Sequence, residues 1–182
     1  PMPEWKSFTF GEDGEATPTA EAPTPASANP AMEPDEYAAK WGTEVSEVTI
    51  ARIEAVLEGD GLPHGSSEFI AFTQLEDIPF QVHREPADAP WAQIETRILP
   101  VGEGHTEASL QAIANRWNTE HLQPTVFPIE SEDGWILVAA SRFFVGEGLS
   151  DRQIHAMLRR GLIIGVSAAQ EVPSFFDEAS AE

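Results

Sequence analysis

The sequence holds five histidines among 31 acidic residues, and these are the residue types that most often bind metals or transfer protons. None of the histidines stands in an H-E-x-x-H motif or close to a second histidine. Glu120 and His121 are adjacent, and adjacent side chains on a helix point about 100° apart, so they cannot share one ion. We therefore expect no metal site. The histidines are His64, His83, His105, His121 and His155.

The serines and glycines also lack the patterns of nucleophilic and phosphate-binding sites. Ser66 and Ser67 follow a glycine, but there is no G-x-S-x-G motif. The V-G-E-G-H loop at 101–105 precedes a predicted helix, yet the acidic Glu103 and the absence of a following lysine disfavour phosphate. Acidic pairs at 76–77 and 132–133 fall in predicted turns, where solvated charge is ordinary. We expect no catalytic residues, no cofactor and no enzymatic activity.

The charge of the chain restricts its partners. The 182 residues include 10 Lys and Arg against 31 Asp and Glu, for a net charge of -21. Such a charge repels phosphate backbones and anionic lipid, so we expect neither nucleic acid nor membrane as a partner. The longest apolar run, LIIGV at 162–166, is too short to cross a bilayer. With no cysteine and no visible secretory signal, a cytoplasmic location is the expectation.

Composition divides the chain into three parts. Residues 1–45 are acidic and rich in Pro and Ala, which predicts a disordered arm because little apolar surface is present to offset ordering entropy. Within it, Trp5, Phe8 and Phe10 form a short aromatic segment that could dock on a folded surface, although a frayed terminus explains it as well. Residues 46–172 are predicted to form the folded domain, and 173–182 an acidic tail.

The hydrophobic pattern of the middle part predicts three helices and five strands. Helical periodicity marks about 49–58, the stretch after Thr106 and the stretch from Ser150 to Val172. Strand patterns mark 68–75, 78–85, 91–100, 124–131 and 134–145, with turn residues between them. The order α-β-β-β-α-β-β-α indicates an α+β two-layer sandwich, an antiparallel five-stranded sheet with its helices on one face.

Several residues are expected to anchor these elements. Trp117 continues the apolar stripe of the second helix, and Asn118 is placed to tie down its last turn or the strand that follows. Ser150 and Gln153 have the spacing of a capping box. Gly161 and Gly165, four residues apart on the last helix, would admit a closely approaching backbone, either of its own sheet or of a second subunit.

An apolar patch is predicted on the sheet face that the helices leave uncovered. Trp91, Trp135, Leu137 and Phe143 are the residues expected there, and they would suit a second subunit or a polypeptide partner. Alternatively, loops or the N-terminal arm cover this face.

Four stretches together resemble the YbjN-domain family in its actinobacterial form. They are the helix VTIARIEAVL, the strand pair around SEDGWILVAAS, N-R-W-N at 115–118 and the closing S-D-R-Q-I-x-x-M-L-R-R-G-L. The resemblance covers about 46–172 and excludes the proline-rich arm. It implies a fold similar to type III secretion chaperones and a role in regulating sensory transduction.

Two functions from different classes follow. The preferred one is a non-enzymatic, homodimeric binding or regulatory protein, chaperone-like, that holds a polypeptide on its sheet face or dimer surface. The polypeptide could be its own aromatic arm segment. The alternative is a small-ligand binder or enzyme with a pocket between helices and sheet.

Overall fold

The computed structural model describes residues 8–10, 16–18 and 43–179, and the side chains of 43–176. The chain divides into two units, Pro1–Tyr37 and Ala38–Glu182. In the first unit, strand β1 (Phe8–Phe10) pairs antiparallel with β2 (Ala16–Pro18). Both strands lie within the arm at 1–45 that we predicted to be disordered, and Trp5 lies outside the described residues.

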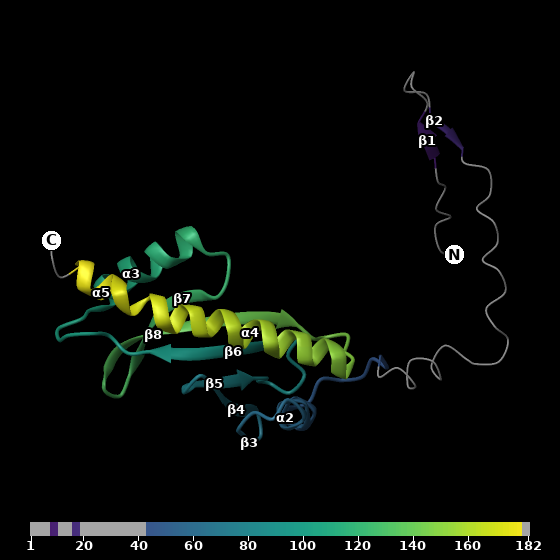
Figure 1. The fold of residues 1–182 in the computed structure, drawn as a ribbon, viewed down its shortest axis with the longest axis horizontal. Coiled ribbons are helices and arrows are strands. Elements are labelled where there is room, and N and C mark those ends of the chain that lie inside the picture. The colour runs from purple at the N-terminus through teal and green to yellow at the C-terminus, as the bar shows by residue number, and fades with distance from the viewer. Residues whose placement is uncertain (1–7, 11–15, 19–42, 180–182) are drawn as a thin grey trace. The chain divides into compact units, whose positions relative to one another are not determined.

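The second unit is an α+β fold built on one antiparallel sheet of six strands in the order β3-β4-β5-β6-β8-β7 (Figure 1). The α+β class and the antiparallel sheet are confirmed, but the predicted count of five strands was wrong. The extra strand, β3, has only three residues, and its sequence HGS carries no apolar alternation that could reveal it. The strands are β3 (His64–Ser66), β4 (Ile70–Leu75), β5 (Ile78–His83), β6 (Trp91–Ile98), β7 (Thr125–Ser131) and β8 (Gly134–Phe144).

The helices begin where the sequence places their caps. Thr49 accepts a hydrogen bond from the backbone N–H of Arg52 at the start of α2 (Ile50–Gly59). Thr106 caps α3 (Glu107–Glu120) in a reciprocal box with Ser109. Ser150 and Gln153 form the predicted capping box of α4 (Asp151–Glu171), with the Gln153 side chain accepting from the Ser150 N–H at 2.8 Å.

The segment after α4 differs from the prediction of an acidic tail. Pro173–Ala179 forms a further helix, α5. Phe176 is only 1% exposed and packs with Ala168 and Val172 in a hydrophobic cluster. Sequence reasoning missed α5 because seven residues are too few to show helical periodicity.

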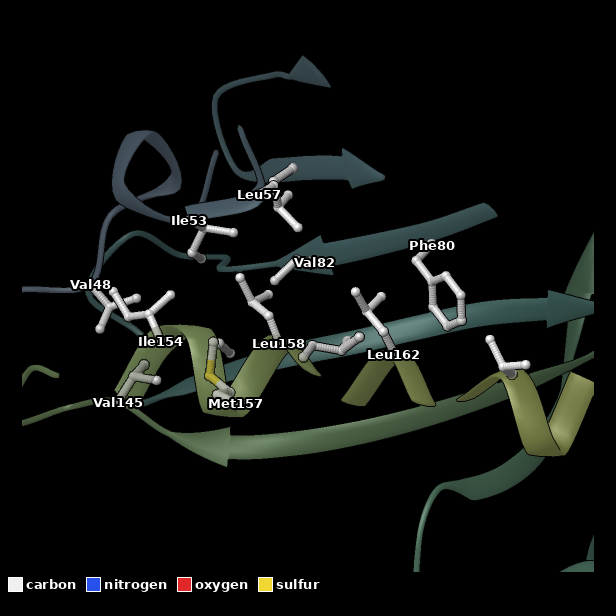
Figure 2. Packing of buried hydrophobic residues seen from close by; sticks show 14 residues of the cluster. Val48, Ile53, Leu57, Phe80, Val82, Val145, Ile154, Met157, Leu158 and Leu162 are labelled. Atoms are coloured by element: carbon white, nitrogen blue, oxygen red, sulfur yellow. The ribbon is translucent and has the colours of Figure 1, made fainter. Parts of the chain in front are cut away.

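Two hydrophobic clusters lie between the sheet and its helices. The first joins α2 and α4 to β4, β5 and β6, and Figure 2 shows Ile53 and Leu57 of α2 opposite Leu158 and Leu162 of α4. The second joins α3, the end of α4 and α5 to β6, β7 and β8 through Trp117, Leu137 and Val126 among others. Since the four helices within 43–179 bury their apolar residues against the same side of the sheet, they form one layer.

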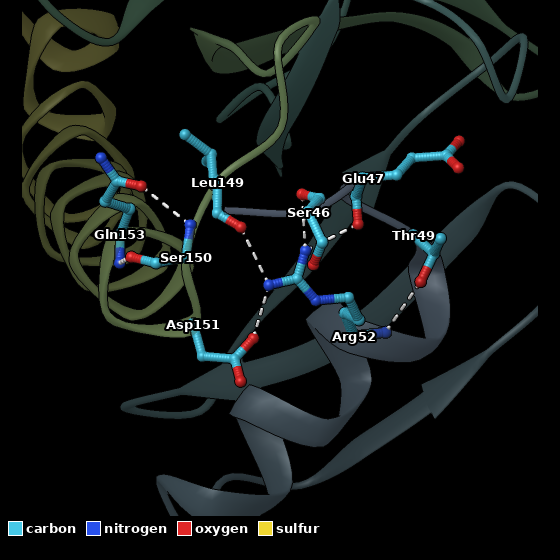
Figure 3. Close-up of polar contacts among 8 residues, drawn as sticks. All are labelled: Ser46, Glu47, Thr49, Arg52, Leu149, Ser150, Asp151 and Gln153. Carbon is cyan, nitrogen blue, oxygen red and sulfur yellow. Dashed lines mark hydrogen bonds and ion pairs between the residues drawn. The ribbon is translucent and has the colours of Figure 1, made fainter. Parts of the chain in front are cut away.

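The entry of the chain into this unit is fastened to the loop before α4. Ser46 pairs with Leu149 as an isolated antiparallel bridge, and Arg52 lies between these two segments (Figure 3). Its guanidinium donates to the carbonyl oxygens of Ser46, Glu47 and Leu149 and to Asp151. Arg52 therefore connects α2 to the start of α4, a role that no pattern in the sequence indicates.

Candidate functional site

The strand registers divide the sheet residues between a helix-covered face and a second face, which we call the helix-free face because no described helix packs on it. Side chains alternate along each strand, and directly paired residues point to the same side. Ala92, Ile94, Thr96 and Ile98 are buried under the helices, so their neighbours on β6 face the other way. The helix-free face consists of Ile70, Phe72, Gln74, Pro79, Gln81, His83, Trp91, Gln93, Glu95, Arg97, Thr125, Phe127, Ile129, Ile136, Val138, Ala140, Arg142 and Phe144.

This division corrects the predicted apolar patch. Leu137 is fully buried in the second cluster, and Trp135 and Phe143 are partly buried against the clusters on the helix-covered side. Only Trp91 of the four predicted residues lies on the helix-free face. The error has a simple origin: β8 is apolar at consecutive positions, so its sequence does not show which alternate residues the helices cover.

Exposed aromatic side chains do occur on the helix-free face. Trp91 is 50% exposed and Phe144 is 53% exposed, and their rings meet edge to face with centroids 5.5 Å apart. Phe72 on β4 is 40% exposed. The sequence does not reveal that Phe144 and Phe72 lie on this face, since their direction depends on the registers of β8 and β4.

A polar network crosses the centre of the same face. Nε2 of His83 lies 3.1 Å from Oε1 of Glu95 and 3.0 Å from Oε1 of Gln81. Both of these oxygens can accept a hydrogen bond from Nε2 in the tautomer that carries the proton there. Gln93 donates from Nε2 to the other carboxylate oxygen of Glu95 at 2.6 Å, and Arg142 donates from Nε to Oε1 of Gln93 at 2.7 Å. The network therefore orients side chains from β5, β6 and β8.

The carboxylate of Glu95 is the centre of this network. Its side chain is only 12% exposed. Burial raises the pKa of Glu95, but the hydrogen bonds from His83 and Gln93 and the charges of His83 and Arg97 outweigh that effect and leave the pKa below its ordinary value. Glu95 is therefore held as a carboxylate that accepts hydrogen bonds.

Two hollows flank the network. One, of about 370 Å³, is lined by Gln93 and Arg142 together with residues from the loop before β7 and from β7 itself. The other, of about 140 Å³, lies between Phe72, Gln81, Glu95 and Arg97. The arrangement offers hydrogen-bonding groups beside apolar surface. This is suited to recognition and contains no nucleophile aligned with a base.

The alternation that produces the network is visible in the sequence, but only the strand register combines its parts. Gln81 and His83 alternate with apolar residues on β5, and Gln93, Glu95 and Arg97 do so on β6. The register Gln81↔Glu95 and His83↔Gln93 brings them side by side. Polar residues at alternate positions of two consecutive strands were the available signal.

The residues that were predicted as structural anchors make contacts within the folded unit. Trp117 is 1% exposed and donates from Nε1 to the carbonyl oxygen of Pro124, and Asn118 exchanges two hydrogen bonds with the backbone of Val126. Gly161 and Gly165 face Ile94 and Phe80 of the chain's own sheet. Phe8 and Phe10 lie in β1, where side chains are not described.

Within 43–176, no group of three or more His, Cys, Asp or Glu side chains is arranged to hold a metal ion. None of the described helices combines the length and apolar character that a membrane span requires.

Comparisons with known proteins agree with the fold. The model of the YbjN family, described as "Putative bacterial sensory transduction regulator", matches residues 49–172, about two thirds of the chain. The crystal structure of YbjN from E. coli, described as "a putative transcription regulator", has a TM-score of 0.55 and 13% identity, and the match covers 72% of this chain and 93% of that one. At this identity the likeness is one of fold.

A second solved structure gives a weaker match. It is the HopA1-SchA chaperone-effector complex, with a TM-score of 0.48, 10% identity and coverage of 68% of this chain and 91% of that one. No curated protein sequence matches the chain.

Proposed function

The chain belongs to the YbjN family, and from that premise we propose that it is a non-enzymatic regulatory protein that holds a polypeptide partner on the helix-free face of its sheet. The observation that carries this proposal is that the described helices cover only one of the two faces of the sheet. One face is buried by the four described helices, while the other presents exposed aromatic rings beside an ordered polar network.

The composition of the helix-free face supports a polypeptide as the partner. Trp91 and Phe144 provide rigid aromatic area, the residue class that contributes most to protein interfaces. Gln81 on β5 and Arg142 on β8 add hydrogen-bonding groups to the same face. An extended segment, whose side chains alternate in direction, can contact both kinds of surface at once.

The partner and the assembly are further parts of the proposal. We expect a homodimer. We also propose that Trp5, Phe8 and Phe10 belong to a docking arm that could supply the bound segment. The family is described as a regulator of sensory transduction, and this description fits a protein that exchanges one binding partner for another.

The alternative is a small-ligand binder or enzyme with a pocket between helices and sheet. It is favoured by a hollow of about 360 Å³ between the end of α2, α4 and β4. There, however, His155 and Asp60 contact each other at 2.8 Å, so this pair is already satisfied by an internal contact. We therefore prefer the polypeptide-binding role.

The proposal is tested by photo-crosslinking at defined positions. A benzoylphenylalanine residue replaces Phe72 on the helix-free face in one sample, and Ile163, which is 48% exposed on α4, in a matched control. Polypeptides crosslinked in cells of the source bacterium are identified by mass spectrometry. We expect one or a few specific polypeptides at position 72 and none of them at position 163.

A variant pair strengthens the test. Trp91→Ser with Phe144→Ser should lose the crosslinked partner, while Ile163→Ser, which removes exposed apolar area on α4, should retain it. Circular dichroism verifies folding, and light scattering gives the mass. The proposal is wrong if position 72 captures the same polypeptides as position 163, or if the Trp91 and Phe144 variant retains its partner.

A further inference from the structure

The outer edge of β8 is incompletely paired. On one side, β6 pairs with β8 as far as Phe144 through Trp91↔Phe144. On the other side, β7 begins at Thr125, which pairs with Ala140, so no described strand pairs with Ser141–Phe144 there. Alternate residues of a strand direct their N–H and C=O groups to each side. This short edge is therefore a template to which an added strand could bind, in line with β7.

The hollow of about 370 Å³ lies at the same corner of the sheet. Its polar groups come from Arg142, Gln123 and Thr125, and its apolar walls include Leu122, which is 95% exposed, and Phe127. An extended segment bound along Ser141–Phe144 would direct one side chain toward these groups and could place an apolar neighbour on Leu122.

Arg142 is held in a defined orientation inside this corner. Among the described residues, its side chain makes one polar contact, from Nε to Oε1 of Gln93 at 2.7 Å. Gln93 is fixed in turn by its 2.6 Å hydrogen bond to Glu95, so its oxygen faces Arg142. With Nε engaged, the two terminal nitrogens remain for a ligand. Guanidinium nitrogens arranged in this way match the two oxygens of a carboxylate.

The charge of the helix-free face also differs from that of the chain. Its strand residues carry Arg97 and Arg142 against Glu95, which sums to +1 before His83 is counted, whereas the whole chain carries -21. The net negative charge of the whole chain repels an acidic segment, whereas the net positive charge of this face attracts it. Charge of opposite sign favours both encounter and register.

Building on the proposed function, we infer that this corner binds an extended acidic segment of the partner polypeptide. The segment pairs with the outer edge of β8 at Ser141–Phe144 and places a glutamate or aspartate carboxylate on the terminal nitrogens of Arg142. Gln93 acts as a positioning residue, because it orients the guanidinium without touching the ligand.

The test uses the full chain and two fluorescein-labelled, C-terminally amidated octapeptides, one alternating Thr with Glu and one alternating Thr with Gln. Anisotropy titrations at low salt measure both affinities. We expect the Glu peptide to bind about tenfold more tightly than the Gln peptide, as one charge-assisted bidentate contact implies. Added salt should reduce this preference, because the contact is partly exposed.

Variants assign the preference to Arg142. Arg142→Gln should abolish the discrimination between the two peptides, and Gln93→Leu should reduce it. Arg159→Gln, which removes an exposed arginine on α4, is the matched control and should leave both affinities unchanged.

Each other outcome overturns the inference in a recognisable way. Equal affinity for both peptides, lowered by the Trp91 and Phe144 substitutions, would refute the acidic preference while sustaining the polypeptide-binding function. Absence of binding by either peptide would contradict both. If Arg142→Gln changes the mass measured by light scattering, the occupant of this corner is a second copy of the chain, and the inference is wrong.

Discussion

The Nη2 atom of Arg52, in the first turn of α2, donates a 2.9 Å hydrogen bond to the backbone carbonyl oxygen of Leu149, 97 residues further along the chain (Figure 3). The same guanidinium donates to the carbonyl oxygens of Ser46 and Glu47 at 2.8 and 2.6 Å. A single side chain thus satisfies three backbone acceptors where the chain enters the domain and where α4 begins.

Replacing Arg52 with Gln should therefore destabilise the domain by about 2–3 kcal/mol, since hydrogen bonds to a charged donor are lost together. Asp151→Asn is the control, because its carboxylate is 70% exposed and its ion pair with Arg52 should contribute less than about 1 kcal/mol. Urea unfolding followed by tryptophan fluorescence measures both changes. Equal losses in the two variants would show that the ion pair, and not the carbonyl contacts, accounts for the stabilisation.

Trp117 should be the costliest truncation on α3. Its ring is 1% exposed, its Nε1 donates to the Pro124 carbonyl oxygen at 2.8 Å, and His121 stacks on it at 3.6 Å between ring centroids. We expect Trp117→Ala to cost about 3–5 kcal/mol in thermal or chemical unfolding. Leu122→Ala, at a side chain that is 95% exposed, should change stability by less than about 0.5 kcal/mol. A Trp117→Ala loss as small as this would mean that the ring is not part of the core.

Gly165 on α4 should not tolerate a methyl group. A Cβ at this position would lie 2.5 Å from Cε1 of Phe80, whose ring is buried on β5. We expect Gly165→Ala to destabilise by about 1–3 kcal/mol through overpacking, despite the better helix propensity of alanine.

A substitution at Gly59 distinguishes the effect of packing from the effect of helix propensity. Gly59 ends α2 with nothing within 4 Å of an added Cβ, so Gly59→Ala should be neutral or stabilising by up to about 1 kcal/mol. Thermal unfolding followed by circular dichroism compares the two. If both substitutions stabilise, α4 does not pack on β5 as closely as the contact requires.

The stability contributed by Glu95 should depend on pH. Its folded-state pKa is lowered, which means that the carboxylate form is favoured by folding. This contribution is complete above the ordinary glutamate pKa and is lost as the pH falls through the lowered one. We expect the free energy of unfolding of the wild type, relative to Glu95→Gln, to decrease on acidification across that interval. A difference that is constant with pH, or one that grows as pH falls, would contradict the direction of the shift.

Helix and strand positions in the domain were largely predictable because each depends on neighbours in sequence. Thr49, Thr106 and Ser150 cap their helices through side chains that bond to backbone groups three residues away. The alternation on β5 and β6 reflects one buried and one helix-free side of the sheet. The short elements β3 and α5 were missed because three and seven residues carry too little periodic signal.

The sequence by itself determined the α+β class, the order of the predicted helices and strands and the resemblance to the family, because these follow from local patterns along the chain. Only the tertiary structure decided which residues share a face. Trp135, Leu137 and Phe143 lie on the helix-covered side, while Phe144 and Arg142 lie on the other. A change of one residue in register reverses every side chain of a strand, and β8 is apolar on both sides, so its partners alone determine its orientation.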